Sequence, residues 1–362
     1  MKLTIFSSVK IAFISGLVAT MLSCDTKSDS LDLKPKGPVP TWGPTIKPEM
    51  QVVIEKLDSL GGKPIETLEP AQARLQPTPT DAVMAVMKDY NIVAPTPQCD
   101  TTGRDIPVTG GTTRIRIYTP KTSAASYPVI VYYHGGGFVI ADINVYNSSP
   151  QALCEQVNAV VVSVEYPKGP EKKFPAAHTV SFDAYQWVLK NAASIKGDSA
   201  KIAVVGESAG ANLATNMSIM ARDKGIKMPL YQVLVYPVAN NDMNSESYVK
   251  YANAKPLNKA MMAWFVKHAL NSTAEAADPR ISLVNANLKG LPKTLVIAAE
   301  IDPLQTEGKL LSDRLKAAQV ETDYQLYTGV THEFFGMTNV VPQAKEAQAL
   351  AAKKLKAALG LQ

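Results

Sequence analysis

The sequence predicts an α/β fold with a mostly parallel, doubly wound sheet. Short runs of β-branched and apolar residues, such as 129–133 and 202–205, recur along the second two-thirds of the chain. Runs of this kind are typical of strands that are buried on both faces of a sheet. Helical patterns such as 211–223 and 304–318 separate them. This alternation indicates a sheet with helices on both sides.

Other segments extend the pattern over an α/β domain expected to span residues 111–362. Residues 114–118 alternate polar and apolar side chains, as an edge strand does. Residues 240–270 interrupt the alternation with a helical stretch that we expect to form a lid. Further strands are expected at residues 159–164, 233–236, 294–298 and 325–327, and further helices at residues 181–189 and 343–359.

The first 23 residues predict a bacterial export signal. Lys2 and Lys10 give a basic start, and residues 11–22 form an uncharged, mostly apolar run, which is shorter than the roughly 20 residues that a membrane span needs. The sequence Met-Leu-Ser-Cys at 21–24 resembles a lipobox, although Met21 stands where leucine is typical. We expect an exported protein, periplasmic or anchored as a lipoprotein through Cys24. The alternative is ordinary cleavage nearby, with Cys24 incidental.

Composition excludes several classes of protein. The chain has 362 residues, of which 46% are hydrophobic and 19% charged, as in soluble globular proteins. Its net charge is +5, and loss of the two signal lysines leaves +3. A charge this small, with no run of like charges, does not indicate nucleic-acid binding.

Residues 24–48 and 49–110 are expected to precede the α/β domain as a tether and as cap helices. Five prolines between residues 31 and 48 predict a stiff, extended tether. The two cap helices are expected at residues 50–60 and 80–90, the second with Thr80 as its N-cap.

Cys99 and Cys154 are the cysteines beyond the N-terminal segment. They are too few for a disulfide framework and lack the spacing of metal ligands, so no metal site is expected. Cys154 lies in an apolar helical stretch, where we expect a small buried side chain.

The pentapeptide Gly-Glu-Ser-Ala-Gly at 206–210 carries the strongest chemical signal. It follows one expected strand and precedes a helix, which is the context of a nucleophile elbow. A very tight turn there holds the hydroxyl of Ser208 out into a cleft, at a helix N-terminus that favours negative charge. The alternative is a glycine-rich turn that binds phosphate.

A second motif, His134-Gly135-Gly136-Gly137-Phe138, directly follows the expected strand 129–133. Acyl transfer builds negative charge on a carbonyl oxygen, and glycines let backbone N–H groups approach that oxygen closely. Motifs of this type form an oxyanion hole together with the residue after the nucleophile, here Ala209. The alternative is a flexible glycine-rich loop.

The general base and its acid partner follow from chain order, because the α/β-hydrolase triad runs serine, acid, histidine. Of the two histidines after Ser208, His268 lies in the expected lid, whereas His332 follows an expected strand. Asp302 stands at the end of strand 294–298 and is favoured as the acid. Glu300 and Asp278 are rivals, the latter in a loop context.

Together these motifs resemble the hormone-sensitive-lipase-like family of bacterial esterases over residues 50–360. The resemblance implies an α/β-hydrolase fold with a helical cap, and an oxyanion hole made by the N–H groups of Gly136, Gly137 and Ala209. His134, Gly135 and Glu207 complete the two motifs. One departure is the sequence Tyr-Pro-Lys-Gly-Pro-Glu at 166–171, where the family usually has Tyr-Arg-Leu-Ala-Pro-Glu.

The same resemblance implies hydrolysis of short- to medium-chain esters without a cofactor. The expected mechanism is two-step acyl transfer through Ser208, His332 and Asp302. Alternatives are a deacetylase of decorated carbohydrates or an amidase with the same triad, and a non-catalytic binding protein on this scaffold. Four large side chains could line the pocket or belong to an ordinary core: Met84, Met87, Met261 and Trp264.

Overall fold

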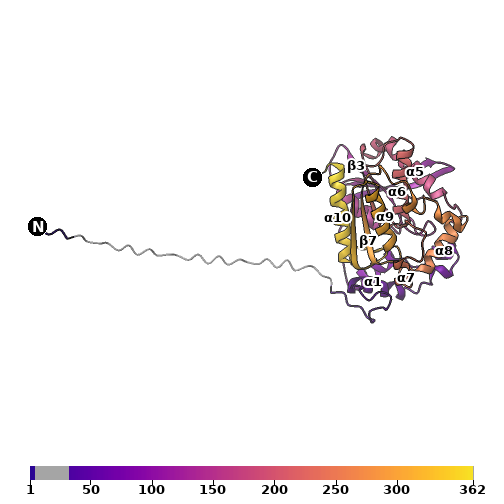
Figure 1. Ribbon diagram of the computed structural model, residues 1–362, viewed down its shortest axis with the longest axis horizontal. Coiled ribbons are helices and arrows are strands. Elements are labelled where there is room, and N and C mark those ends of the chain that lie inside the picture. Colours follow the sequence, from indigo (N-terminus) through magenta and orange to yellow (C-terminus); the bar gives the residue numbers. More distant parts are fainter. Residues whose placement is uncertain (5–31, 362) are drawn as a thin grey trace. The chain divides into compact units, whose positions relative to one another are not determined.

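An eight-stranded sheet forms the centre of the fold in the computed structural model, which describes residues 1–4 and 32–361 (Figure 1). The strand order is β1-β2-β4-β3-β5-β6-β7-β8. The first two pairings, β1 with β2 and β2 with β4, are antiparallel, and all the others are parallel. The strands are β1 Cys99–Val108, β2 Gly111–Pro120, β3 Tyr127–Tyr133, β4 Val160–Val164, β5 Gly197–Glu207, β6 Tyr231–Val235, β7 Lys293–Ile301 and β8 Thr322–Thr331.

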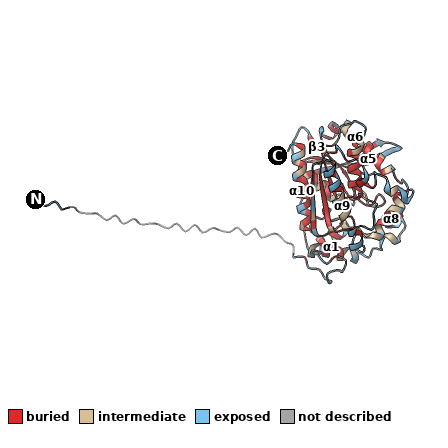
Figure 2. Ribbon diagram, in the orientation of Figure 1, coloured by how far each residue is buried: buried red, intermediate tan, exposed pale blue. Residues whose placement is uncertain are grey.

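Helices cover both faces of this sheet. Helices α4 (Ser148–Val157) and α10 (Pro342–Leu359) pack together on one face. Helices α5 (Ala176–Asn191), α6 (Ala209–Asp223) and α9 (Gln305–Ala317) lie on the other face (Figure 1). Every residue of β3, β4 and β6 is buried, as Figure 2 shows for the centre of the sheet. The expectation of a doubly wound α/β fold is confirmed.

Smaller helices from two parts of the chain form the cap. The N-terminal part contributes α1 (Pro48–Ser59), α2 (Pro70–Ala73) and α3 (Pro79–Asp89). The insertion between β6 and β7 contributes α7 (Glu246–Lys250) and α8 (Lys259–Ala269). An apolar cluster joins the two parts, and the Trp264 indole donates a 2.9 Å hydrogen bond to the Leu68 carbonyl. Residues 32–361 also contain five 3₁₀ turns: η1 Ile65–Thr67, η2 Ala192–Ile195, η3 Thr273–Ala277, η4 Leu283–Asn285 and η5 Phe334–Gly336.

Three details of the N-terminal half differ from expectation. Residues 114–118, expected as an edge strand, lie in β2, the second strand of the sheet. The edge is occupied by β1, which lies within residues 49–110, where only cap helices were expected. Most β1 side chains are exposed, so this strand lacks the apolar run by which the others were found. Helix α3 is capped by Thr78 rather than Thr80: the Thr78 side chain accepts from the Asp81 N–H in a capping box.

The proline-rich segment before α1 is not a free tether, since residues 32–47 belong to the same compact unit as the sheet. Leu33 and Ile46 are buried, and the N–H of Lys47 donates a 2.9 Å hydrogen bond to the Gly329 carbonyl. Prolines stiffen a chain but do not stop it docking on a surface. Cys24 and residues 5–23 of the expected signal segment lie outside the described residues.

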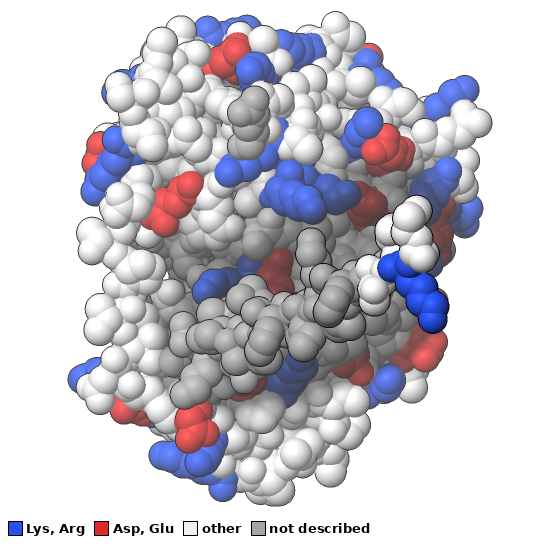
Figure 3. All heavy atoms as spheres, turned by 90° about the vertical axis from the view of Figure 1, so that its left-hand side faces the viewer, with Lys and Arg blue, Asp and Glu red and all other residues white. Residues whose placement is uncertain are grey.

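The surface carries mixed charge. On the face that Figure 3 shows, basic and acidic side chains are interspersed. Within the described residues, no helix is both long and apolar enough to cross a bilayer.

Candidate active site

Ser208 occupies a sharp turn between β5 and α6. Its backbone has φ 57° and ψ −118°, which is a strained conformation for a residue with a side chain. Backbone hydrogen bonds hold the turn. The Ser208 N–H donates a 2.9 Å bond to the Val235 carbonyl on β6, and the Ser208 carbonyl accepts from the N–H groups of Ala211 and Asn212. The residue is only 5% exposed. The hydroxyl is thus presented at a fixed point at the carboxyl end of β5.

Close packing explains the glycines on either side of Ser208. A Cβ atom on Gly206 would lie 2.0 Å from the Gly210 carbonyl oxygen, and one on Gly210 would lie 2.0 Å from the Tyr133 carbonyl oxygen. Real Cβ atoms do not approach backbone oxygens so closely. A side chain at Gly210 would therefore push the elbow away from β3, and one at Gly206 would force the elbow itself open.

Asp302 and His332 follow the ends of β7 and β8 and meet there. The Nδ1 atom of His332 lies 2.7 Å from Oδ2 of Asp302, while Oδ1 accepts a 2.8 Å bond from the Leu304 N–H. Both side chains are buried. Burial lowers the pKa of His332, but the charge and hydrogen bond of Asp302 outweigh it, so the net pKa is raised.

The rival residues have other partners. Glu300 accepts hydrogen bonds from the Thr45 hydroxyl, at 2.9 Å, and from the Gly329 N–H, at 2.7 Å. Asp278 pairs with Arg280 at 2.8 Å. His268 lies on α8, where its ring packs beside Trp264. Asp302 is therefore the carboxylate that contacts His332.

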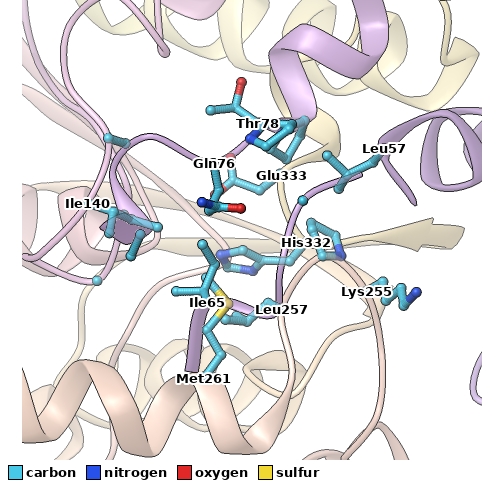
Figure 4. A pocket seen from close by; sticks show the side chains of 18 of the residues that line it. Leu57, Ile65, Gln76, Thr78, Ile140, Lys255, Leu257, Met261, His332 and Glu333 are labelled. Atoms are coloured by element: carbon cyan, nitrogen blue, oxygen red, sulfur yellow. The ribbon is translucent and has the colours of Figure 1, made fainter. Parts of the chain in front are cut away.

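Ser208 and His332 line one cavity of about 430 Å³ under the cap. In Figure 4, side chains from both parts of the cap surround His332, including Ile65, Leu257 and Met261. Of the four large side chains considered for the pocket, Met261 lines this cavity, while Met84 and Met87 line a second one of about 410 Å³. Trp264 is buried in the apolar cluster of the cap.

The glycine-rich loop forms another wall of this cavity. Gly136 and Gly137 both have positive φ, at 101° and 58°. The ring of Phe265 lies 2.3 Å from where a Cβ atom on Gly137 would stand. Among the described residues, no acceptor is found for the N–H groups of Gly136, Gly137 and Ala209. Three backbone donors thus remain available beside Ser208.

His134 supports this loop from behind. Its ring stacks on Tyr166 with centroids 4.2 Å apart, and its Nδ1 atom lies 2.7 Å from the Gly135 carbonyl oxygen. Burial lowers the pKa of His134 to about 4, so the ring is neutral at physiological pH. The Tyr166 hydroxyl donates to the carbonyls of His134 and Gly135, which fixes the start of the loop.

Two glutamates lie beside His332: Glu207 is buried, and Glu333 is partly buried at the wall of the cavity. Glu207 accepts hydrogen bonds from the hydroxyls of Tyr132 and Tyr236, and burial raises its pKa to about 7. Glu333 has φ 72° and accepts a hydrogen bond from the Tyr146 hydroxyl, and burial raises its pKa as well. The sequence places Glu333 next to His332, but nothing in its pattern predicts its hydrogen bond with Tyr146.

Comparison with known proteins identifies the family. A model described as the alpha/beta hydrolase fold matches residues 130–336. Carboxylesterase NlhH of Mycobacterium tuberculosis is 34% identical over 249 residues, 68% of this chain and 78% of that protein. An ethyl acetate hydrolase of Pseudomonas putida is 27% identical over 86% of this chain and 98% of that protein.

Solved structures agree with the sequence matches. A hyperthermophilic esterase from Pyrobaculum calidifontis superimposes with a TM-score of 0.77 at 34% identity, covering 86% of this chain and 98% of that one. A thermostable esterase from Pseudomonas putida ECU1011 gives 0.79 at 30% identity, covering 88% and 99%. This chain belongs to the α/β-hydrolase family and, within it, to the hormone-sensitive-lipase-like esterases.

Proposed function

We propose that this protein is a serine carboxylesterase that hydrolyses short- to medium-chain acyl esters through an acyl-enzyme intermediate. Ser208 is the nucleophile, His332 the general base and Asp302 its partner. The observation that carries the proposal is the 2.7 Å contact between His332 and Asp302, beside a cavity that Ser208 also lines. A serine on an elbow and a histidine oriented by a buried carboxylate are the parts that acyl transfer needs.

The mechanism follows from these contacts. Asp302 holds the Nδ1–H of His332, which leaves the Nε2 atom as the acceptor for the hydroxyl proton of Ser208. Ser208 then attacks the ester carbonyl, and the protonated imidazole gives its proton to the leaving alcohol. Water attacks the acyl-enzyme by the same route and releases the acid. Asp302 stabilises the imidazolium that forms in both steps.

The oxyanion of each tetrahedral intermediate is proposed to sit on the N–H groups of Gly136, Gly137 and Ala209. Support comes from their open hydrogen-bonding capacity and from the position of Ala209 at the start of α6. Preorganised donors of this kind stabilise charge without rearranging during the reaction.

The cavity favours a small substrate with an apolar acyl group. Its apolar lining includes Ile65, Ile140, Leu257, Met261 and Phe265. Its volume of about 430 Å³ suits a compact ligand. A relative named for the hydrolysis of ethyl acetate supports a short acyl chain. The cap closes over this space from both parts of the chain, so a long acyl chain would have to displace cap side chains.

We also propose that the protein is exported and carries lipid on Cys24. Support comes from the basic start, the apolar run and the lipobox-like sequence at 21–24.

Replacing Ser208 by alanine is expected to lower kcat for a nitrophenyl ester by about 10³-fold or more, because the nucleophile is lost. The protein should also stop reacting with a fluorophosphonate probe. Ser123→Ala, in an exposed loop, is the matched control and should behave like the wild type. Turnover near the wild-type rate in Ser208→Ala would remove the proposal.

Gly137→Ala tests the oxyanion hole. The new Cβ atom meets the Phe265 ring at an unfavourable φ of 58°, so the N–H should move and kcat should fall by roughly 10²–10³-fold. Gly225→Ala is the control, since Gly225 has φ 63° but open space around it. Equal activity of the two variants would contradict the assignment, provided that circular dichroism shows both folded.

Glu333→Gln is expected to move the acid limb of the kcat/KM profile to lower pH. His332 acts as a base only when neutral, so activity falls as pH drops through its pKa, which the negative charges of Asp302, Glu333 and Glu207 raise. Removing one of these charges lowers that pKa. The exposed Glu246→Gln is the control, and an unchanged or upward-shifted limb in Glu333→Gln would count against this account.

Cys24→Ser should abolish incorporation of an alkyne-labelled fatty acid during expression in a bacterial host, because no thiol remains for lipid attachment. Cys99→Ser should keep the label. An unlabelled wild-type protein, or label retained in Cys24→Ser, would show that Cys24 is not the lipid site.

A further inference from the structure

The fold brings together two cysteines that lie far apart in sequence. Cys99 is the first residue of the edge strand β1, and Cys154 lies on α4. Both thiols are free and buried in the structure, α4 contacts β1, and each thiol affects the pKa of the other. Glu155 reinforces this junction: its Oε1 atom accepts a 2.9 Å bond from the Gln98 N–H and lies 3.9 Å from the Cys99 sulfur.

The junction marks a weak point of the chain. Residues 93–98, which lead from α3 of the cap to β1, are all exposed. Among the strands of the described chain, β1 pairs only with β2, and most of its side chains are exposed. Cys99 is therefore the first buried residue after an exposed segment, and Cys154 is a buried residue of α4, the helix that contacts β1.

We propose that Cys99 and Cys154 form an intramolecular disulfide that fastens the start of β1 to α4. Formation of this bond rests on the proposed export, because a pair of thiols becomes a substrate for oxidation in an oxidising compartment. The bond would close a loop of about 55 residues that contains β1, β2, β3 and the glycine-rich loop, and closing a loop of this length stabilises a fold by restricting the unfolded chain.

The reaction is thiol–disulfide exchange with a small-molecule disulfide or a disulfide oxidoreductase. One cysteine thiolate attacks the donor disulfide and forms a mixed disulfide, releasing one donor thiol. The second thiolate then attacks the mixed disulfide, so that the Cys99–Cys154 bond forms and the second donor thiol leaves. The two electrons and two protons of the protein thiols end on the donor.

The environment of the thiols dictates when this exchange occurs. Burial raises the pKa of both thiols in the folded protein, so few thiolates are present there. The pair should therefore react during folding, before α4 and β1 cover it, and the finished bond should resist reduction for the same steric reason.

The test uses the full chain with Cys24→Ser, which leaves only the two thiols in question. The denatured protein is refolded either in a mixture of reduced and oxidised glutathione or in excess phosphine reductant. It is then denatured again with N-ethylmaleimide and weighed intact. We expect no maleimide after oxidative refolding and two after reductive refolding. Two maleimides in both samples, or a glutathione adduct in place of the bond, would overturn the proposal.

Thermal unfolding provides the second readout. The oxidised form should melt higher than the reduced form by on the order of 5 °C. The same redox treatments should leave the melting temperature of Cys154→Ser unchanged. Equal melting temperatures of the oxidised and reduced parent protein would show that the bond does not fasten the strand.

The outcome is separable from that of the proposed esterase function. Neither cysteine lines the cavity that holds Ser208 and His332. Both redox forms should therefore hydrolyse a nitrophenyl ester at the same rate at 25 °C, and only their inactivation rates on heating should differ. A bond that forms in an inactive protein would support the disulfide and refute the esterase.

Discussion

The strained backbone of Ser208 is the constraint on which the rest of the site depends. A left-handed conformation costs on the order of 1–3 kcal/mol for a residue with a side chain. Here the surrounding structure fixes it: β5 is bound on both sides by β3 and β6, and α6 begins at the next residue. Because the elbow cannot relax without breaking these elements, the hydroxyl keeps its place relative to the histidine.

Sheet direction explains why the site could be predicted from the sequence. The glycine-rich loop and Ser208 follow β3 and β5, and Asp302 and His332 follow β7 and β8. These strands are all parallel, so their carboxyl ends share one edge of the sheet. Each site residue directly follows one of these strands in the sequence. Apolar runs that identify the strands therefore also place the site residues at the same edge of the sheet.

The features that escaped prediction depend on contacts between distant segments. Strand β1 has few buried side chains, so its pairing with β2 leaves no apolar pattern. The segment 32–47 docks through backbone groups and through Thr45 with Glu300, and proline content carries no information about such a partner. The sequence favoured Asp302 over Glu300 as the partner of His332, but its pattern could not predict that Thr45 and Gly329 donate hydrogen bonds to Glu300.

The two glutamates show how the site holds charge. Glu207 and Asp302 are buried and Glu333 is partly buried near His332, and three negative charges so close together would repel one another. Burial raises the pKa of Glu207 to about 7, which leaves it partly protonated near neutral pH. Tyrosine hydroxyls donate to both glutamates and disperse the remaining charge. Acyl transfer places a positive charge on His332, so a surrounding shell with more acidic than basic groups is suited to the moment when the imidazolium forms.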